Sequence, residues 1–253
     1  MKKAYILLRK SGTLLCFIIF GLGSLAISMT VIPFLWLLFW NVAKRKLVFT
    51  RIVRLSWCFF RKIMETLWLI KIQVSQKDIL TLKSAASTII VANHTSLIDI
   101  IILVSLTNDA TCIVKGRLFQ NPLIRFILAN AFIGNDQDPI ELIDHAVAAL
   151  MSGYNLIIFP EGTRGNGEVK LRRGAAYIAM ESLSDVLVLR IDADPPHLRK
   201  GRGWRDAGEK RVVYNIRVKA ILKPQIILNT EKSRNINARM ITKRIKEAFD
   251  ETS

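Results

Sequence analysis

Residues 91–99 read VANHTSLID and mark the point where a strand pattern gives way to a helix pattern. Residues 87–92 (STIIVA) are apolar and rich in β-branched side chains, which predicts a buried strand. Residues 97–106 (LIDIIILVSL) are apolar over a length typical of a buried helix. Strands and helices alternate in the rest of the chain, which predicts an α/β fold: a mixed, mostly parallel sheet flanked by helices, with ligand loops at the strand ends.

The same patterns predict the remaining elements outward from this stretch. Residues 72–83 should form a strand and a turn that lead into the sheet. Strands are expected over residues 110–114, 131–134, 155–159, 186–191 and 211–222, and helices over residues 122–130, 139–151, 174–183 and 233–250.

The first stretch contains a histidine and an aspartate with four residues between them. One interpretation makes Asp99 structural: Ser96 caps the helix, and Asp99 completes a capping box in which Glu or Gln is more usual. The other makes His94 a general base whose ring is oriented by Asp99, while a substrate hydroxyl gives its proton to the other ring nitrogen. The spacing alone leaves both open, because such pairs are common by chance.

A second stretch, residues 159–164 (FPEGTR), follows another apolar run. Pro160 ends that strand, and glycines at positions 162, 165 and 167 give a permissive loop. Four basic residues follow closely: Arg164, Lys170, Arg172 and Arg173. Backbone donors near a helix start, with guanidinium groups beside them, suit a phosphate. A solvated basic loop is the alternative.

Together, the two stretches resemble the glycerolipid acyltransferase family, whose best-known members acylate lysophosphatidate. The resemblance covers about residues 85–195. It implies acyl transfer, without a metal or cofactor, from coenzyme A or acyl carrier protein to a lysophospholipid hydroxyl, most simply 1-acyl-glycerol-3-phosphate. It also implies that His94 is the base and Asp99 its partner. The acceptor's polar head would be bound by Glu161, Gly162, Thr163 and Arg164.

Two departures from the family pattern concern the acceptor. Residues 133–136 (IGND) lack an arginine that many relatives carry, so Lys115 or Arg117 is expected to contact the phosphate instead. Residues 188–191 (VLRI) lack the proline that is usual in this strand of the family. Residues 192–197 (DADPPH) are similar to short bacterial members associated with specialised lipids such as aryl polyenes. A specialised acceptor is therefore one alternative. A non-catalytic, membrane-tethered lipid-binding scaffold is another, which the intact His94, Asp99 and Glu161 disfavour.

The reaction itself also has an alternative route, through an acyl-enzyme on Thr95 or Ser96. This route is disfavoured because immediate neighbours of a base rarely reach the geometry needed for attack, and Ser96 is the better helix cap.

The N-terminal segment predicts a membrane-associated part. Residues 13–40 form 28 uncharged residues, where about 20 span a bilayer. A tilted single span fits, and so does a re-entrant pair of half-helices broken near residues 21–24 or at Pro33, which we favour because the thioester donor is cytosolic. Residues 51–72 suit a helix in the membrane interface. We therefore expect a membrane segment over residues 1–72 and a catalytic domain over residues 73–253, on the cytoplasmic side of the inner membrane.

The charge distribution agrees with this division. The chain has 37 basic and 20 acidic residues, a net charge of +17, and residues 1–72 hold 12 of the basic residues against one acid, Glu65. Such a bias beside apolar sequence favours anionic lipid headgroups over nucleic acid. Cys16, Cys58 and Cys112 are scattered and odd in number, which predicts reduced thiols and no metal site. His145 and His197 lack partners at informative spacing and are expected to be surface or structural.

Overall fold

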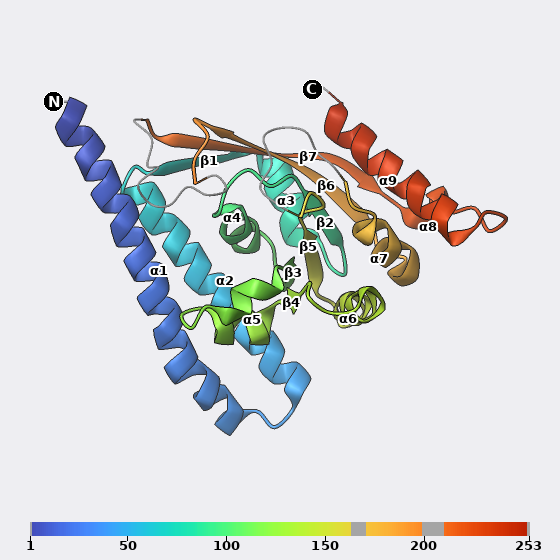
Figure 1. Ribbon diagram of the computed structural model, residues 1–253, viewed down its shortest axis with the longest axis horizontal. Helices are drawn as coiled ribbons and strands as arrows, with labels where there is room; N and C mark the ends of the chain where they lie inside the picture. Colours follow the sequence, from blue (N-terminus) through green and yellow to red (C-terminus); the bar gives the residue numbers. More distant parts are fainter. Residues whose placement is uncertain (1, 163–170, 199–209, 252–253) are drawn as a thin grey trace.

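A computed structural model of the chain describes residues 2–162, 171–198 and 210–251. Its centre is a seven-stranded sheet in the order β1-β7-β6-β2-β5-β3-β4 (Figure 1). The strands are β1 (Ile70–Val74), β2 (Ile89–Ala92), β3 (Ala110–Val114), β4 (Ile133–Gly134), β5 (Asn155–Ile158), β6 (Val186–Asp194) and β7 (Val212–Leu222). Neighbouring strands are parallel except β6 and β7, which are antiparallel. The predicted fold class, a mixed and mostly parallel sheet, is confirmed.

Helices cover both faces of this sheet (Figure 1). One face carries α1 (Lys2–Leu38), α2 (Val42–Thr66), α4 (Asp99–Leu106) and α5 (Arg125–Ala131), and the other carries α6 (Pro139–Met151), α7 (Gly174–Ser182) and α9 (Arg234–Asp250). The remaining helices are α3 (Gln76–Ser84), α8 (Pro224–Ile227) and the short 3₁₀ helix η1 (Gly116–Gln120). A buried apolar cluster lies on each face.

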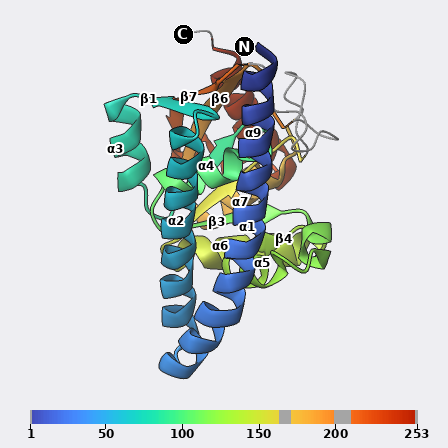
Figure 2. The ribbon, with the colours of Figure 1, turned by 90° about the vertical axis from the view of Figure 1, so that its left-hand side faces the viewer.

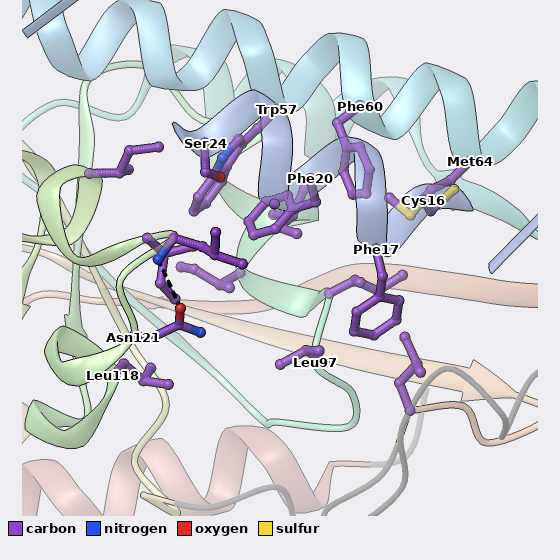
Figure 3. A pocket seen from close by; sticks show the side chains of 18 of the residues that line it. Cys16, Phe17, Phe20, Ser24, Trp57, Phe60, Met64, Leu97, Leu118 and Asn121 are labelled. Atoms are coloured by element: carbon purple, nitrogen blue, oxygen red, sulfur yellow. Dashed lines mark hydrogen bonds between the residues drawn. The ribbon is translucent and has the colours of Figure 1, made fainter. Parts of the chain in front are cut away.

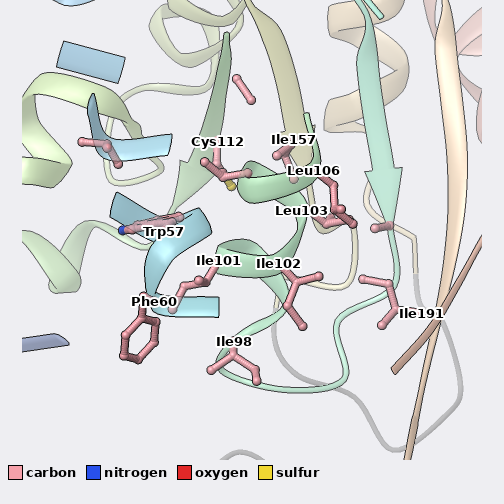
Figure 4. Close-up of a cluster of buried hydrophobic side chains, with 14 of the residues drawn as sticks. Trp57, Phe60, Ile98, Ile101, Ile102, Leu103, Leu106, Cys112, Ile157 and Ile191 are labelled. Atoms are coloured by element: carbon pink, nitrogen blue, oxygen red, sulfur yellow. The ribbon is translucent and has the colours of Figure 1, made fainter. Parts of the chain in front are cut away.

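The helix α4 is buried on all sides, which explains why its sequence is apolar without a polar face. It lies between α2 and the sheet (Figure 4). Trp57 and Phe60 of α2 pack on one side, and Cys112 and Ile157 of the sheet pack on the other. Because packing fixes α4 from both sides, the loop that precedes it is held rigidly at the end of β2.

The helices α1 and α2 form a long antiparallel hairpin that extends beyond the sheet (Figure 1, Figure 2). The helix α1 runs unbroken through residues 21–24 and Pro33, so the predicted break at either place is wrong. The chain turns only at residues 39–41, where Asn41 caps α2 by accepting from the Lys44 N–H (2.9 Å). At the other end, the buried side chain of Arg9 donates to the carbonyl of Trp68 (2.9 Å). This contact anchors the start of α1 to the end of α2.

The helix predicted over residues 51–72 falls within α2, the turn after it and the start of β1. Trp57 and Phe60 are buried, whereas Phe59 is 67% and Trp68 65% exposed, so a position in the membrane interface stays a prediction.

One local expectation about residues 72–83 is wrong. Residues 76–84 form the helix α3 rather than a turn, because the hydroxyl of Ser75 accepts from the Asp78 N–H (3.0 Å) and caps it.

Candidate active site

His94 and Asp99 meet at the carboxyl end of β2. Asp99 is the first residue of α4 and is fully buried, and its Oδ2 lies 2.9 Å from Nδ1 of His94. The His94 side chain is 19% exposed, so its ring is held by a buried carboxylate on one side and is accessible on the other.

The same carboxylate organises the turn between β2 and α4. Asp99 Oδ2 accepts from the backbone N–H groups of Thr95 (2.6 Å) and Ser96 (2.8 Å). Asp99 Oδ1 accepts from the hydroxyls of Ser96 (2.7 Å) and Thr95 (3.1 Å). The helix begins later than expected, with Ile98 as its N-cap, so the prediction of Ser96 as the cap is wrong. Asp99 therefore serves both interpretations: it closes the turn and it holds His94.

A residue that the sequence did not reveal supports this turn from β7. Tyr214 is fully buried, and its hydroxyl donates to Ser96 Oγ (2.9 Å). Burial raises the pKa of Tyr214, so the phenol stays protonated and remains a donor. The available sequence signal was the alternation of β7, which places Tyr214 on an inward face without showing what it contacts.

The second stretch packs against the first. The Phe159 ring stacks on the His94 ring, with 4.3 Å between the ring centroids. Glu161 Oε1 accepts from the backbone N–H of His94 (3.3 Å). Burial raises the pKa of Glu161, and the His94 N–H acts in the opposite direction. Since β2 and β5 are parallel neighbours, their carboxyl ends bring both loops to one edge of the sheet.

The turn after Glu161 needs a glycine. Gly162 has φ +65°, a conformation that residues with a Cβ rarely adopt. Arg172 returns to this turn: its N–H donates to the Pro160 carbonyl (3.0 Å), and its Nε would lie 3.3 Å from a Cβ added at Gly162. Arg173 is exposed at the start of α7. Thr163, Arg164 and Lys170 lie outside the described residues.

Lys115 and Arg117, which the sequence analysis proposed as phosphate contacts in place of a missing arginine, lie farther along the sheet. Lys115 follows β3, which is the neighbour of β5 on the side away from β2, and Arg117 is exposed in η1. Asp136 packs tightly here, because a Cβ added at Gly116 would lie 2.1 Å from its Cγ. Residues 133–136, which contain no arginine, therefore place a carboxylate beside Gly116.

An apolar cavity of about 340 Å³ begins beside the turn between β2 and α4 (Figure 3). Leu97 and Ile98, which lie between His94 and Asp99 in the chain, form part of its wall. The rest of the wall comes largely from α1, α2 and the segment from η1 to α5, including Cys16, Phe20, Ser24, Trp57, Phe60, Met64, Leu118 and Asn121. Pockets of roughly 300–1,000 Å³ are typical of small-molecule sites.

The other two histidines differ in their surroundings. His145 is exposed and its Nδ1 lies 2.7 Å from Gln137 Oε1, as expected for a surface residue. His197 is 4% exposed and lines the cavity. Cys16 and Cys112 are buried, Cys58 is half-buried, and all three are free thiols. In the described parts of the chain, no group of three or more His, Cys, Asp or Glu side chains could hold a metal ion.

Comparison with known proteins gives one family match. The family model described as Acyltransferase matches residues 71–192, which contain His94, Asp99 and Glu161. The match identifies this part of the chain as an acyltransferase domain, and the protein is an acyltransferase.

Among solved structures, the fold is similar to that of PlsC from Thermotoga maritima, a 1-acyl-sn-glycerophosphate (LPA) acyltransferase. The two chains align over 100% of each, with a TM-score of 0.67 and 20% sequence identity. No curated protein sequence gives a significant match.

Proposed function

We propose that the protein transfers a fatty acyl group from acyl-CoA or acyl carrier protein to the hydroxyl of a lysophospholipid. The proposed acceptor is 1-acyl-glycerol-3-phosphate, and the product is phosphatidate. The observation that carries this proposal is the 2.9 Å contact between His94 Nδ1 and the buried Asp99, because a proton held on Nδ1 leaves Nε2 as the basic nitrogen. The structurally similar PlsC is described as acting on the same acceptor.

The proposed reaction needs one base and no covalent enzyme intermediate. The acceptor hydroxyl gives its proton to Nε2 of His94 while its oxygen attacks the thioester carbonyl carbon. The tetrahedral intermediate then collapses, the C–S bond breaks, and the departing sulfur takes the proton from His94. Asp99 stabilises the imidazolium between the two transfers. General base catalysis of this kind contributes about 10²–10⁴-fold, so positioning of the substrates supplies the remainder.

The contacts of Ser96 and Thr95 support direct attack over an acyl-enzyme. The hydroxyls of both residues donate to Asp99, and Ser96 is fully buried beneath Tyr214. Neither hydroxyl is directed at His94, which a nucleophile would need. Mass spectrometry after incubation with acyl thioester should show no adduct on either residue; an adduct on Ser96 would contradict direct attack.

The acceptor's phosphate is proposed to lie at the turn formed by Glu161 and Gly162. Arg172 over this turn supports the assignment, because guanidinium groups bind phosphate oxygens in pairs. Five further residues from the sequence analysis remain candidates for this role: Thr163, Arg164, Arg173, Lys115 and Arg117. The apolar cavity beside Leu97 is proposed to hold an acyl chain, since its wall is almost entirely hydrocarbon.

We also propose that the hairpin of α1 and α2 associates with the inner membrane, with the catalytic residues facing the cytoplasm. Among the residues that the structure describes, Lys3–Leu38 is the one stretch long and apolar enough to cross a membrane. Large apolar side chains are exposed near the hairpin turn, with Leu37 76% and Trp40 92% exposed. Lys44, Arg45 and Lys46 follow at once, which suits anionic headgroups. Residues 1–72 would form this membrane part and residues 73–253 the catalytic part.

The direct test is turnover by the purified full-length protein in mixed micelles. Labelled acyl-CoA and acyl carrier protein should be offered with a panel of lyso-lipids and specialised-lipid alcohols. We expect lysophosphatidate to be the best acceptor and His94→Ala to abolish its acylation. His145→Ala removes an exposed histidine and serves as the matched control. Full turnover by His94→Ala would remove His94 from the mechanism, and a better acceptor elsewhere in the panel would replace lysophosphatidate.

A further inference from the structure

Arg190 lies beside the loop that carries His94. The strand β6 pairs in parallel with β2 up to the residue before Arg190 and then continues past the end of β2. Asn93 prolongs the pairing with its side chain: Nδ2 donates to the Ile191 carbonyl (2.8 Å) and Oδ1 accepts from the Ile191 N–H (2.7 Å). Paired strands are about 4.8 Å apart. The backbone at Arg190 is thus fixed one strand spacing from the residue that precedes His94.

The guanidinium group of Arg190 is anchored through one of its nitrogens. Its Nε donates to Asp192 Oδ1 (3.1 Å), and the other oxygen of Asp192 accepts from Nη2 of Arg217 (2.7 Å). Strand alternation places all three side chains on one face of β6 and β7. Within the described ranges, the terminal amino groups of Arg190 donate no hydrogen bond, and 31% of the side chain is exposed. Asp192 therefore orients the guanidinium group of Arg190 and leaves its terminal nitrogens, Nη1 and Nη2, available to donate.

Glu161 connects this arginine to the catalytic pair. Burial raises the pKa of Glu161, while the His94 N–H and, more weakly, the positive charge of Arg190 act in the opposite direction. Arg190 thus acts on the carboxylate that contacts the backbone of His94. The cluster of Arg190, Asp192 and Arg217 carries one net positive charge at the edge of the sheet where the acceptor must bind.

We propose that Arg190 binds the phosphate group of the acyl acceptor and thereby selects phosphorylated over neutral acceptors. The proposal rests on the acyl transfer proposed above and adds the group that recognises the phosphate. Nε is used by Asp192, so Nη1 and Nη2 can each donate to one phosphate oxygen. Asp192 is a positioning residue for this contact. Arg217 keeps the partly exposed carboxylate of Asp192 paired when Arg190 is replaced.

The test compares Arg190→Ala with the unchanged protein in the micelle assay, using lysophosphatidate and the neutral monoacylglycerol as acceptors. We expect the KM for lysophosphatidate to rise about ten- to hundredfold, the range for a lost charge-assisted contact. The KM for monoacylglycerol and for the thioester donor should not change. Inorganic phosphate should compete with lysophosphatidate in the unchanged protein and much less in the variant. Arg190→Lys keeps the positive charge but lacks the paired N–H donors of a guanidinium group. Its KM for lysophosphatidate should lie between those of the unchanged protein and Arg190→Ala.

Arg234→Ala is the matched control, because it removes one exposed arginine that pairs with Glu181 on α7, away from the His94 loop. It should leave every KM unchanged. A rise in the donor KM would assign the phosphates of coenzyme A to Arg190 and overturn the proposal. An unchanged KM for lysophosphatidate, or an equal rise for both acceptors, would overturn it as well. If the unchanged protein acylates neither acceptor, the proposed function fails first, which is a distinct result.

Discussion

The hydroxyl of Tyr214 donates to Ser96 Oγ across 2.9 Å, although the two residues are 118 positions apart in the chain. Ser96 Oγ in turn donates to Asp99 Oδ1 (2.7 Å), and Asp99 Oδ2 contacts His94. A buried chain of hydrogen bonds therefore runs from β7 to the imidazole. It stabilises the turn between β2 and α4 that carries His94.

The first prediction concerns Tyr214, at the β7 end of this series of hydrogen bonds. Tyr214→Phe removes the donor and leaves Ser96 Oγ with one partner fewer, so we expect a loss of about 1 kcal/mol in the free energy of unfolding. Turnover should fall several-fold with little change in substrate KM, since only the orientation of the base is affected. Thermal denaturation and initial rates measure the two effects. Tyr177→Phe, which removes a surface contact with Asn235, is the control. Unchanged turnover in Tyr214→Phe would show that the chain does not orient His94.

The second prediction concerns the carboxylate. In Asp99→Asn the amide can donate to Nδ1 of His94, which would place the ring proton on Nε2, the nitrogen that must accept. The corresponding exchange in a serine protease triad costs about 10⁴-fold in kcat, and we expect a loss of similar size. Steady-state kinetics across a pH series measure it. Asp144→Asn changes an exposed carboxylate on α6 and should be neutral. Near-normal kcat in Asp99→Asn would mean that Asp99 is only a structural part of the turn.

The sequence predicted the contact between His94 and Asp99 because both residues lie within one strand end and the turn that follows it. Tyr214 and Arg190 were not found, since strand alternation tells which way a side chain points and not which distant residue it meets. The course of α1 was also missed. The glycines near position 21 and Pro33 are weak helix formers, yet packing against α2 maintains the helix, in line with the rule that tertiary contacts override propensity. Only contacts between distant segments could have shown these features.

The third prediction uses two glycines of α1. Gly21 lines the apolar cavity, and a Cβ added there would lie 3.3 Å from Leu123. Gly23 is exposed and has nothing within 4 Å. Gly21→Leu should shorten the cavity and shift the preference toward shorter acyl thioesters, while Gly23→Leu gives the same gain in helix propensity without filling it. Competition between thioesters of different chain length measures the shift. Equal profiles for the two variants would argue against an acyl chain in this cavity.

The fourth prediction concerns the hairpin turn. Leu37 and Trp40 are exposed, and burying a large apolar side chain contributes roughly 1.5–3 kcal/mol. The double variant Leu37→Glu, Trp40→Glu should therefore bind anionic vesicles much more weakly in a co-sedimentation assay. Leu80→Glu, at an exposed position on α3, is the control. Undiminished sedimentation of the double variant would mean that the hairpin turn is not the membrane contact.

The fifth prediction follows from Glu161. Because burial raises its pKa in the folded protein, the unfolded chain ionises at a lower pH, and ionisation costs the folded state stability. This cost appears as the pH rises above the usual value of 4.5 and is complete above the raised pKa. In Glu161→Gln the new amide oxygen can still accept from the His94 N–H, but the side chain cannot ionise. The Tm of Glu161→Gln minus that of the unchanged protein should therefore increase with pH across this window and then level off. Glu231→Gln, at an exposed carboxylate, controls for the lost charge. A difference that falls with rising pH would mean that the site stabilises the Glu161 carboxylate.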